Sequence, residues 1–413
     1  MGATIVRQPI IGPDGEAVAY ELLYEDRGVS LYNQQDTQAA NMIEDFLLEM
    51  DSSRLLNNKK AFITFTPNLL EKDIPKMFNP EALVIQIEDN ILVHPVAQKL
   101  IEEHKHNGYE IAIKGFEFSS RYFAILDVID IIKLNMAKPN PSMNSILDIA
   151  NSFKKRVIGY NVSSQEIYES TKALGIEYMQ GSSVAESMYT AVPQMEHLQS
   201  NFFQLIIAIT KEEPDLDDIA AIISRDVTLT FSLLKLVNSA YFALRNPARS
   251  VKQALVVLGV GQLKQWIYLL SFKNSDGKIP TELIKTSFLR GQFCQELSPY
   301  IASLPINKSE AYLLGMFSTL GLLMGVPLGD ALEPLPIADE IKAALMDSEG
   351  VCGDLYQLVL KYDNADFKGM APLAASLGLE ENIVSQKYLE SAEYVNQIWN
   401  DLMSPYSAES AKT

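Results

Sequence analysis

Cysteine and histidine are scarce in this chain of 413 residues, which contains two cysteines and four histidines. The cysteines, Cys294 and Cys352, lie far apart and in no CxxC or Cys/His spacing, which argues against a disulfide framework and against a zinc ribbon. No histidine follows His197, so the second half cannot supply a histidine ligand to a metal site. We therefore expect a protein of a reducing cytoplasm that carries no cofactor.

Basic residues are also few, with 34 Lys and Arg against 52 Asp and Glu, and the formal net charge is −18. The field of such a chain repels phosphate backbones, and no basic stripe offsets it locally. We expect no nucleic-acid partner. A hydrophobic fraction of 47% and a charged fraction of 21% are typical of a folded globular protein.

Long apolar runs are almost absent, and residues 311–329 form the one stretch near the length of a membrane span. This stretch is free of charge, but it contains Ser318, Thr319, Pro327 and four glycines, and no basic flank orients it. The pattern favours a buried helix, and we expect no membrane insertion. The first residues also lack the basic and apolar regions of a signal peptide.

Up to about residue 190, short β-branched runs alternate with amphipathic helical stretches, which is typical of repeated βα units. Runs 6–11 and 18–24 flank the turn sequence Pro13-Asp14-Gly15, which predicts an antiparallel hairpin. Six parallel strands and this hairpin predict a closed barrel. The parallel candidates are residues 60–66, 83–88, 110–114, 131–135, 156–160 and 178–180.

From about residue 198 the alternation stops, and apolar residues recur at helical spacing almost to the end. The fold class is therefore predicted as α/β followed by all-α, with a (β/α) barrel over 1–192 and a helical domain over 197–405. Further helices are predicted at 37–50, 141–154, 261–272, 280–302, 308–325, 338–347, 352–362, 370–377 and 381–403.

Capping residues mark several of these helices. Asp215 is an N-cap candidate followed by acidic residues in the first turn, and Asp226 is a cap for the next helix. Ser250 and Gln253 have the spacing of a capping box, and Gly259 supplies a left-handed stop.

Seven ordered motifs carry a resemblance to a known family. RQPIIGPDGEAVAYELLYE resembles the opening of EAL domains, which are cyclic di-GMP phosphodiesterases, and the later motifs are FITFTPNLL, VIQIEDN, IAIKGF, DIIKLN, VIGYNVSS and YMQGS. The resemblance covers nearly all of residues 3–185 and implies a TIM-like barrel with its site at the carboxyl ends of the strands.

The resemblance also implies that most family metal ligands are replaced. The signature glutamate is Glu21, but the other ligand positions are Thr64, Gln86, Lys114, Gly115, Asn135 and Tyr160. The phosphate-binding arginine corresponds to Glu25, whereas Lys133 matches the family's catalytic lysine and is expected to pair with Glu21 or Asp130. We expect no metal and no catalytic residue. The vestigial pocket is predicted to consist of Glu21, Thr64, Gln86, Asp89, Lys114, Phe116, Lys133, Asn135, Tyr160 and Gln180.

The helical half resembles HDOD domains, which are relatives of HD phosphohydrolases without the metal site. The hallmarks are the Asp226 segment, the triplet Asn238-Ser239-Ala240 and the helix ending Leu258-Gly259, and coverage runs over roughly 197–400. Ser318-Thr319 stands where the superfamily has its His-Asp pair, and we expect both hydroxyls to satisfy backbone carbonyls.

Two further polar signals favour structural roles. His104 and His106 are two residues apart on a helix and point in different directions, so a solvated face is expected rather than a metal pair. Asn238 is expected to cap a turn between helices.

Together, these features predict a bacterial-type cytoplasmic signalling protein that has lost catalysis. It is expected to act through protein partners in cyclic di-GMP-related signalling, with the barrel as a surface for a homodimer or another protein. Two alternatives stay open: an effector that binds cyclic di-GMP or another nucleotide in the vestigial pocket, and a weak residual phosphodiesterase that uses Glu21, Asp89 and Lys133.

Overall fold

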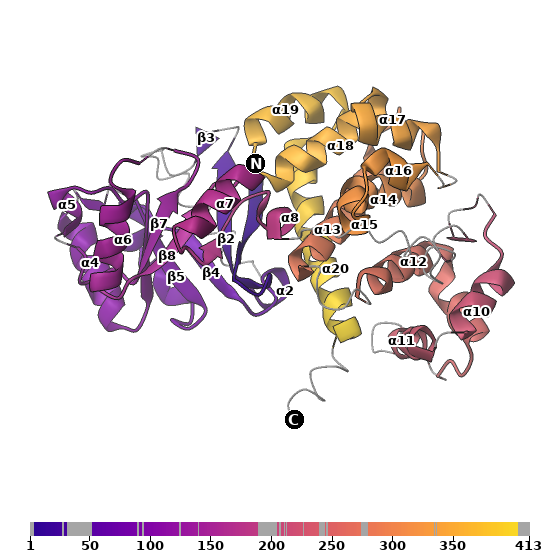
Figure 1. Cartoon of the computed structure of the whole chain (residues 1–413), viewed down its shortest axis with the longest axis horizontal. Coiled ribbons are helices and arrows are strands. Elements are labelled where there is room, and N and C mark those ends of the chain that lie inside the picture. The colour runs from indigo at the N-terminus through magenta and orange to yellow at the C-terminus, as the bar shows by residue number, and fades with distance from the viewer. Residues whose placement is uncertain are drawn as a thin grey trace. The chain divides into compact units, whose positions relative to one another are not determined.

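The structure, a computed structural model, divides the chain into two compact units. The first consists of Met1–Met188, Leu360–Ala374 and Glu380–Leu389, and the second consists of Tyr189–Val359, Ala375–Leu379 and Glu390–Thr413. Figure 1 shows the course of the chain. The structure describes residues 4–26, 29–30, 52–88, 91–92, 95–123, 125–138, 140–188, 205, 208–209, 211, 213–225, 227–238, 244, 247–273, 280–333, 335 and 337–403.

The first unit opens with the predicted hairpin. Strands β1 (Thr4–Ile11) and β2 (Ala17–Asp26) pair antiparallel along their length. Gly15 adopts φ +81 in the turn, a conformation that glycine reaches without steric cost. The prediction of an antiparallel hairpin around Pro13-Asp14-Gly15 is therefore confirmed.

Six parallel strands complete a closed barrel of eight strands, as predicted. Neighbouring strands pair in the order β2, β4, β5, β6, β7, β8 and β9, and β1 closes the ring by pairing antiparallel with β9. The short strand β3 (Val29–Ser30) is added at the edge of β2. The parallel strands are β4 (Lys60–Thr64), β5 (Leu83–Ile87), β6 (Glu110–Lys114), β7 (Ile131–Asn135), β8 (Arg156–Tyr160) and β9 (Tyr178–Met179).

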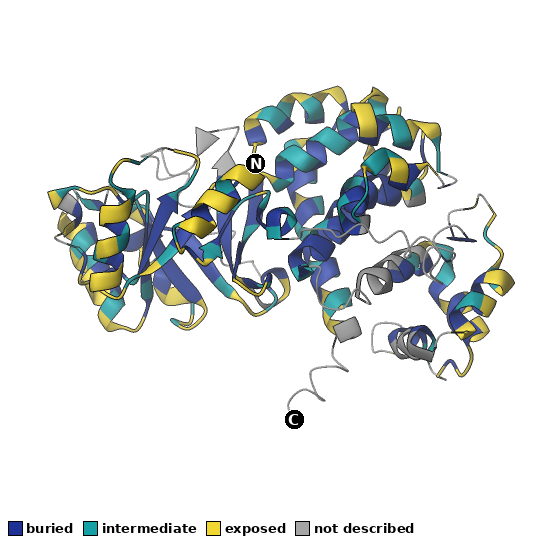
Figure 2. Cartoon of the chain, in the orientation of Figure 1, coloured by how far each residue is buried: buried dark blue, intermediate teal, exposed yellow. Residues whose placement is uncertain are grey.

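The helices between these strands cover the outside of the barrel, with their outer faces exposed and the strands buried (Figure 2). The prediction at 141–154 is confirmed as α6, whereas the predicted helix at 37–50 lies outside the described residues. The elements are α2 (Ser52–Leu55), α3 (Pro67–Glu71), the 3₁₀ helix η2 (Ile74–Met77), α4 (Pro95–His106), α5 (Ser120–Phe123), α6 (Met143–Ser152), α7 (Gln165–Ala173) and α8 (Val184–Met188).

One ring of apolar side chains fills the middle of the barrel. Each member is contributed by a different strand, and together they form a buried cluster against which Tyr178 of β9 packs. Layers of this kind make a barrel interior a packed core rather than a channel. The members of the cluster are Ile10, Ala19, Phe62, Val84, Ala112, Ile131 and Ile158.

The described part of the second half is helical, as predicted. Its elements begin with α10 (Leu216–Ser224), α11 (Val227–Val237), α12 (Val251–Lys273), α13 (Thr281–Leu297) and the 3₁₀ helix η5 (Ser298–Tyr300). They continue with α14 (Lys308–Met316), the 3₁₀ helix η6 (Phe317–Thr319), α15 (Leu320–Met324), α16 (Leu328–Leu332), α17 (Asp339–Asp347), α18 (Gly350–Asp363), α19 (Phe367–Ser376) and α20 (Glu381–Met403).

The predicted continuous helix over 308–325 is wrong in detail. The chain tightens into η6 after Met316, and α15 ends at Met324, where Gly325 forms the cap in the left-handed conformation. A Cβ at Gly321 would lie 2.8 Å from the backbone of Leu328, so glycine permits the tight return into α16. No described helix is both long enough and apolar enough for a membrane span.

The predicted caps are present in part. Asp215 accepts hydrogen bonds from the backbone N–H groups of Asp217 and Asp218 at the start of α10. Ser250 Oγ accepts from Gln253 N at 3.2 Å, but Gln253 reaches back to Arg249 N rather than to Ser250 N. Gly259 has φ +71 and breaks the helical path inside α12, whereas the predicted cap Asp226 lies outside the described residues.

The sequence-based domain boundaries, 1–192 and 197–405, stay a prediction. Leu360–Ala374 and Glu380–Leu389 belong to the compact unit of the barrel, although they follow the helical segment in the chain.

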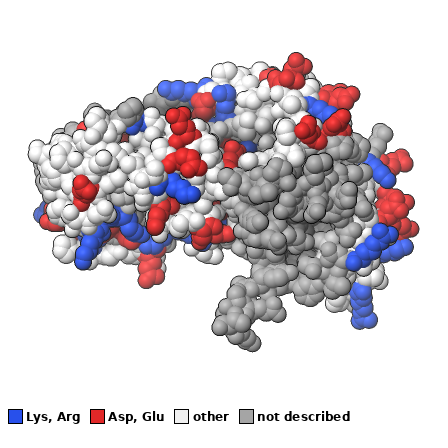
Figure 3. Space-filling model, viewed as in Figure 1, with Lys and Arg blue, Asp and Glu red and all other residues white. Residues whose placement is uncertain are grey.

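On the face drawn in Figure 3, acidic and basic side chains of the first unit are interspersed.

Candidate functional site

A polar ring lies two residues beyond the apolar ring, toward the carboxyl ends of the parallel strands. Side chains alternate between the two faces of a strand, so the second residue after an inward-facing one also faces inward. We call this set the polar ring. It consists of Gln8, Glu21, Thr64, Gln86, Lys114, Lys133, Tyr160 and Gln180.

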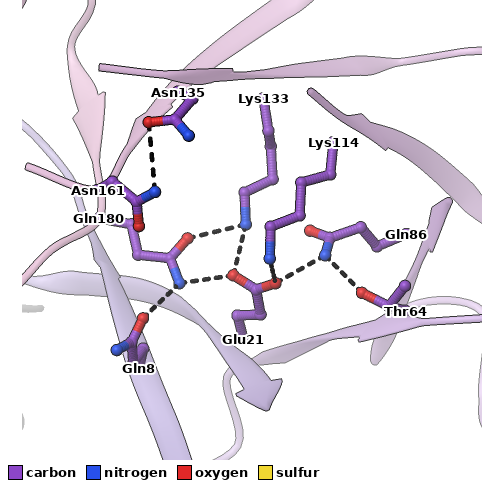
Figure 4. A network of polar contacts seen from close by, with 9 residues as sticks. All are labelled: Gln8, Glu21, Thr64, Gln86, Lys114, Lys133, Asn135, Asn161 and Gln180. Atoms are coloured by element: carbon purple, nitrogen blue, oxygen red, sulfur yellow. Dashed lines mark hydrogen bonds and ion pairs between the residues drawn. The ribbon is translucent and has the colours of Figure 1, made fainter. Parts of the chain in front are cut away.

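Glu21 lies at the centre of the polar ring and is 1% exposed. Its Oε1 accepts hydrogen bonds from Lys114 Nζ at 2.8 Å and from Gln86 Nε2 at 2.7 Å. Its Oε2 accepts from Lys133 Nζ at 2.7 Å and from Gln180 Nε2 at 2.6 Å. Four donors from four different strand positions therefore occupy both oxygens of one carboxylate (Figure 4).

Neutral side chains extend this network around the ring. Gln86 Nε2 also donates to Thr64 Oγ1 at 2.7 Å, and Lys133 Nζ also donates to Gln180 Oε1 at 2.8 Å. Gln180 Nε2 donates to Gln8 Oε1 at 3.2 Å, which links β1 to the network. Gln8 is missing from the sequence-based site, although the inward parity of β1, set by Ile10, would have identified it.

The two lysines determine the charge of this site. Burial alone would raise the pKa of Glu21, but the nearby ammonium groups of Lys114 and Lys133 hold it far below its usual value. Burial lowers the pKa of Lys133 to about 8, and the like charge of Lys114 adds to this effect. Burial opposes ionisation of Lys114 too, but Glu21 and then Glu88 raise its pKa above the usual value. With one carboxylate and two ammonium groups, the polar ring carries a surplus positive charge.

Tyr160 and Asn135 lie at the outer side of the polar ring. The Tyr160 ring centroid is 5.3 Å from Lys114 Nζ and 5.8 Å from Lys133 Nζ, within the range of cation–π attraction. Asn135 Oδ1 accepts from Asn161 Nδ2 at 3.2 Å and from Ala137 N at 3.1 Å. Asn135 therefore stabilises the loop after β7.

Phe116, one of the predicted pocket residues, has another setting. Phe116 is 2% exposed and packs on Tyr122 at 4.8 Å between ring centroids, so it belongs to the core beside the mouth. Asp89 lies outside the described residues, as does the side chain of Glu25. The expected pairing of Lys133 with Glu21 is present, whereas Asp130 pairs with Lys105 at 2.5 Å.

The donor set at this mouth does not fit a pair of divalent cations. Hard cations need several oxygen ligands and compensating negative charge, whereas ammonium groups already hold both oxygens of Glu21. Within the described ranges, no group of three or more His, Cys, Asp or Glu side chains is arranged to hold a metal. We derive no metal-dependent step from these residues.

In the second unit, Ser318 and Thr319 contact side chains of α13. Thr319 is 2% exposed, and its hydroxyl is hydrogen-bonded to the Ser287 hydroxyl, whereas Ser318 Oγ accepts from Arg290 at 3.3 Å. Their predicted bonds to backbone carbonyls are therefore wrong, because η6 turns both hydroxyls toward the neighbouring helix. The pair serves helix packing.

Asn238 behaves as predicted, since its side chain donates to Ala248 O at 3.0 Å and accepts from Ala248 N at 2.7 Å.

The prediction for His104 is wrong, because His104 is fully buried and its ring lies edge-on to Tyr109 at 5.5 Å between ring centroids. The expected solvated face holds only for His106, which is exposed. The helical period places residue 104 on the buried face with Ala97 and Ile101.

Comparison with known proteins finds a family model that matches part of the chain and relatives that match nearly all of it. Residues 195–331 match the family model of the HDOD domain. Over 409 residues the chain is 27% identical to the protein YuxH of Bacillus subtilis, covering 96% of this chain and 99% of that protein. It is 25% identical over 408 residues to a Vibrio cholerae protein named cyclic di-GMP phosphodiesterase CdgJ, covering 95% of this chain and 92% of the relative.

Solved structures similar to this chain include two EAL domains. An EAL domain protein from Listeria monocytogenes is 19% identical and covers 48% of this chain and 92% of its own, with a TM-score of 0.36. The FimX EAL domain from Pseudomonas aeruginosa is also 19% identical and covers 44% of this chain and 88% of its own, with a TM-score of 0.35.

The class of protein follows from the ordered motifs of the barrel and from the family-model match. The chain joins an eight-stranded barrel, which resembles EAL domains in its ordered motifs, to a helical segment in which residues 195–331 match the HDOD model. The predicted fold class and the resemblance to an EAL–HDOD fusion are confirmed.

Proposed function

We propose that this chain is a regulatory protein of cyclic di-GMP-related signalling that acts through protein contacts and does not hydrolyse a dinucleotide. One observation carries the proposal: both oxygens of Glu21 are held by Lys114, Lys133 and two amides. Two-metal hydrolysis depends on carboxylates that converge on the ions, and in the polar ring the single carboxylate is neutralised internally.

One relative supports the pathway and supplies the competing activity. CdgJ is named as a cyclic di-GMP phosphodiesterase, so hydrolysis is the outcome that a test of this chain must exclude. The purified full-length chain is incubated with cyclic di-GMP and Mg²⁺ or Mn²⁺, and the linear product is measured by chromatography. We expect no product above that of a protein-free control. Turnover that disappears in a Glu21→Gln variant would overturn the proposal.

An exposed aromatic pair supports action through protein contacts. Phe118 and Phe123 are 50% and 43% exposed and lie edge-to-face at 5.8 Å between centroids, in the segment after β6. Exposed aromatic side chains are typical of protein interfaces. Light scattering and crosslinking of the Phe118→Ser/Phe123→Ser variant should show weaker association with a second copy or a partner. Phe153→Ser, at a residue 47% exposed, is the matched control and should leave association unchanged.

A second candidate function is a non-catalytic receptor for an anionic nucleotide. The surplus positive charge of the polar ring favours this function, because an anionic ligand is attracted to it. The Lys114 side chain is 20% exposed at the mouth and presents part of this charge to solvent. Titration calorimetry with cyclic di-GMP distinguishes the two functions. Saturable binding that Lys114→Gln weakens, while Lys105→Gln at the opposite end does not, supports the receptor. Absence of heat at hundreds of micromolar ligand removes it.

A further inference from the structure

Among the described residues, strand β1 has a strand partner on only part of its outer edge. It pairs with β2 from Thr4↔Glu25 to Ile11↔Ala17, whereas its pairing with β9 is limited to Ile11↔Met179. Buried backbone N–H and C=O groups must be hydrogen-bonded, so the remainder of this edge needs other partners.

Side chains from the end of the chain supply these partners. Tyr362 of α18 donates its hydroxyl to Ile5 O at 2.7 Å, and Ser385 Oγ of α20 accepts from Ile5 N at 3.3 Å. Tyr388 of α20 donates to Arg7 O at 3.3 Å. We call Tyr362, Ser385 and Tyr388 the C-terminal clasp, and all three belong to the compact unit of the barrel.

The C-terminal clasp is part of a buried core. Tyr362 and Tyr388 are 0% and 1% exposed, and their rings pack at 4.8 Å between centroids. Burial raises the pKa of both phenols, so the hydroxyls stay protonated and donate hydrogen bonds. A buried hydroxyl without an acceptor is costly. The β1 carbonyl groups provide acceptors for the two tyrosine hydroxyls, and the hydroxyls provide donors for these carbonyl groups.

The segment of β1 that the clasp holds leads directly into the polar ring. Residue 8 follows Arg7, and its side chain faces the interior, where Gln8 Oε1 accepts from Gln180 Nε2. Gln180 in turn donates to Glu21. A continuous series of contacts thus joins the clasp, β1 and the central carboxylate within one compact unit.

We propose that the C-terminal clasp supplies the hydrogen-bond partners that β9 does not supply along the outer edge of β1 and thereby positions Gln8 against Gln180. Residues 360–374 and 380–389 are then structural parts of the barrel's compact unit, and the helical segment before residue 360 is inserted into the chain of that unit. This role does not depend on whether the mouth binds or hydrolyses a nucleotide.

Amide exchange in the full-length chain tests the first part of the proposal. In Ser385→Ala, the Ile5 amide should exchange about tenfold faster, as loss of one hydrogen bond implies. The Val6 amide points toward β2 by the alternation of an antiparallel pair and should keep its rate. Unchanged exchange at Ile5, or equal acceleration at Ile5 and Val6, would overturn the proposed clasp.

Tyr-to-Phe variants test the second part, since they remove only hydroxyls. In Tyr362→Phe/Tyr388→Phe, and to a smaller extent in each single variant, the side-chain amide resonances of Gln8 and Gln180 should shift. Tyr109→Phe is the matched control, because Tyr109 donates to Pro75 O and Phe78 O at 2.9 Å each, away from β1. Resonances that stay in place in the single and double variants, or that move equally in the control, would refute the positioning of Gln8.

Discussion

The two ends of the barrel use charge in opposite ways. At the carboxyl end, two ammonium groups share one carboxylate that is 1% exposed. At the amino end, Glu110 bonds Lys60 at 2.8 Å and Arg156 at 2.5 Å, with side chains 29% to 51% exposed. Exposed pairs contribute little to stability, whereas charges buried with imperfect compensation are costly to keep. The difference indicates that the mouth is specialised, whereas the opposite end is an ordinary solvated rim.

The largest expected effect is at the central carboxylate. Glu21→Gln removes the counter-charge of the fully buried Lys133 and one of the counter-charges of Lys114, and we expect the free energy of unfolding to fall by about 3–5 kcal/mol. Glu110→Gln, the matched change at the amino end, should cost about 1 kcal/mol or less. Urea unfolding of both variants measures the difference, and equal losses would contradict the contrast between the two ends.

The stability that Glu21 contributes should also depend on pH. The pKa of Glu21 is depressed in the folded chain, so the stability it contributes is complete above its unfolded pKa of about 4.5. This contribution is lost as the pH falls toward the lower folded pKa. The stability gap between the wild type and Glu21→Gln should therefore narrow from pH 5 downward.

Two glycines at opposite ends of β9 give the next largest contrast. A Cβ at Gly181 would lie 2.1 Å from Val162 O, so Gly181→Ala forces the backbone apart and should cost about 3 kcal/mol. Gly175 has φ +75, and no heavy atom lies within 4 Å of the place that a Cβ would take. Gly175→Ala should therefore cost about 1 kcal/mol through backbone strain alone. Thermal unfolding compares them, and a larger loss at Gly175 would reverse the interpretation.

Helix α4 repeats the contrast between buried and exposed groups on one element. Burial lowers the pKa of His104, so the unfolded chain binds its proton more readily and stability should fall below pH 6.5. The slope is at most about 1.4 kcal/mol per pH unit for one proton. His104→Leu should flatten this dependence between pH 7 and 5, whereas His106→Leu at the exposed position should retain it. Unfolding curves recorded at several pH values decide between these outcomes.

The smallest expected effect is a shift in the pKa of one lysine, Lys133. Lys114→Met removes a like charge near Lys133, so the pKa of Lys133 should rise above its value of about 8. Lys105→Met at the other end should not change it. An NMR titration of the Lys133 side chain measures the shift, and an unchanged or lower value would show that Lys114 does not act on Lys133.

Much of the barrel and of its site follows from the sequence. The turn at Pro13-Asp14-Gly15 and the β-branched runs define the strands, and the position of each strand end predicts which side chains reach the mouth. Gln8 escapes this rule because β1 runs antiparallel, so its mouth residue precedes the apolar Ile10 instead of following it. The sequence analysis also missed the burial of His104. A single polar residue on an apolar helix face is taken as exposed unless the helical period is counted.

By itself, the sequence determined the alternation of strands and helices, the helical second half and the placement of Lys114 and Gln86 at the ends of strands. Each depends on residue type and on spacing along the chain. Only the tertiary structure decided that four donors converge on Glu21, and that Tyr362, Ser385 and Tyr388 complete the edge of β1. Those contacts join residues up to 381 positions apart, and such distant pairs are fixed by packing rather than by local pattern.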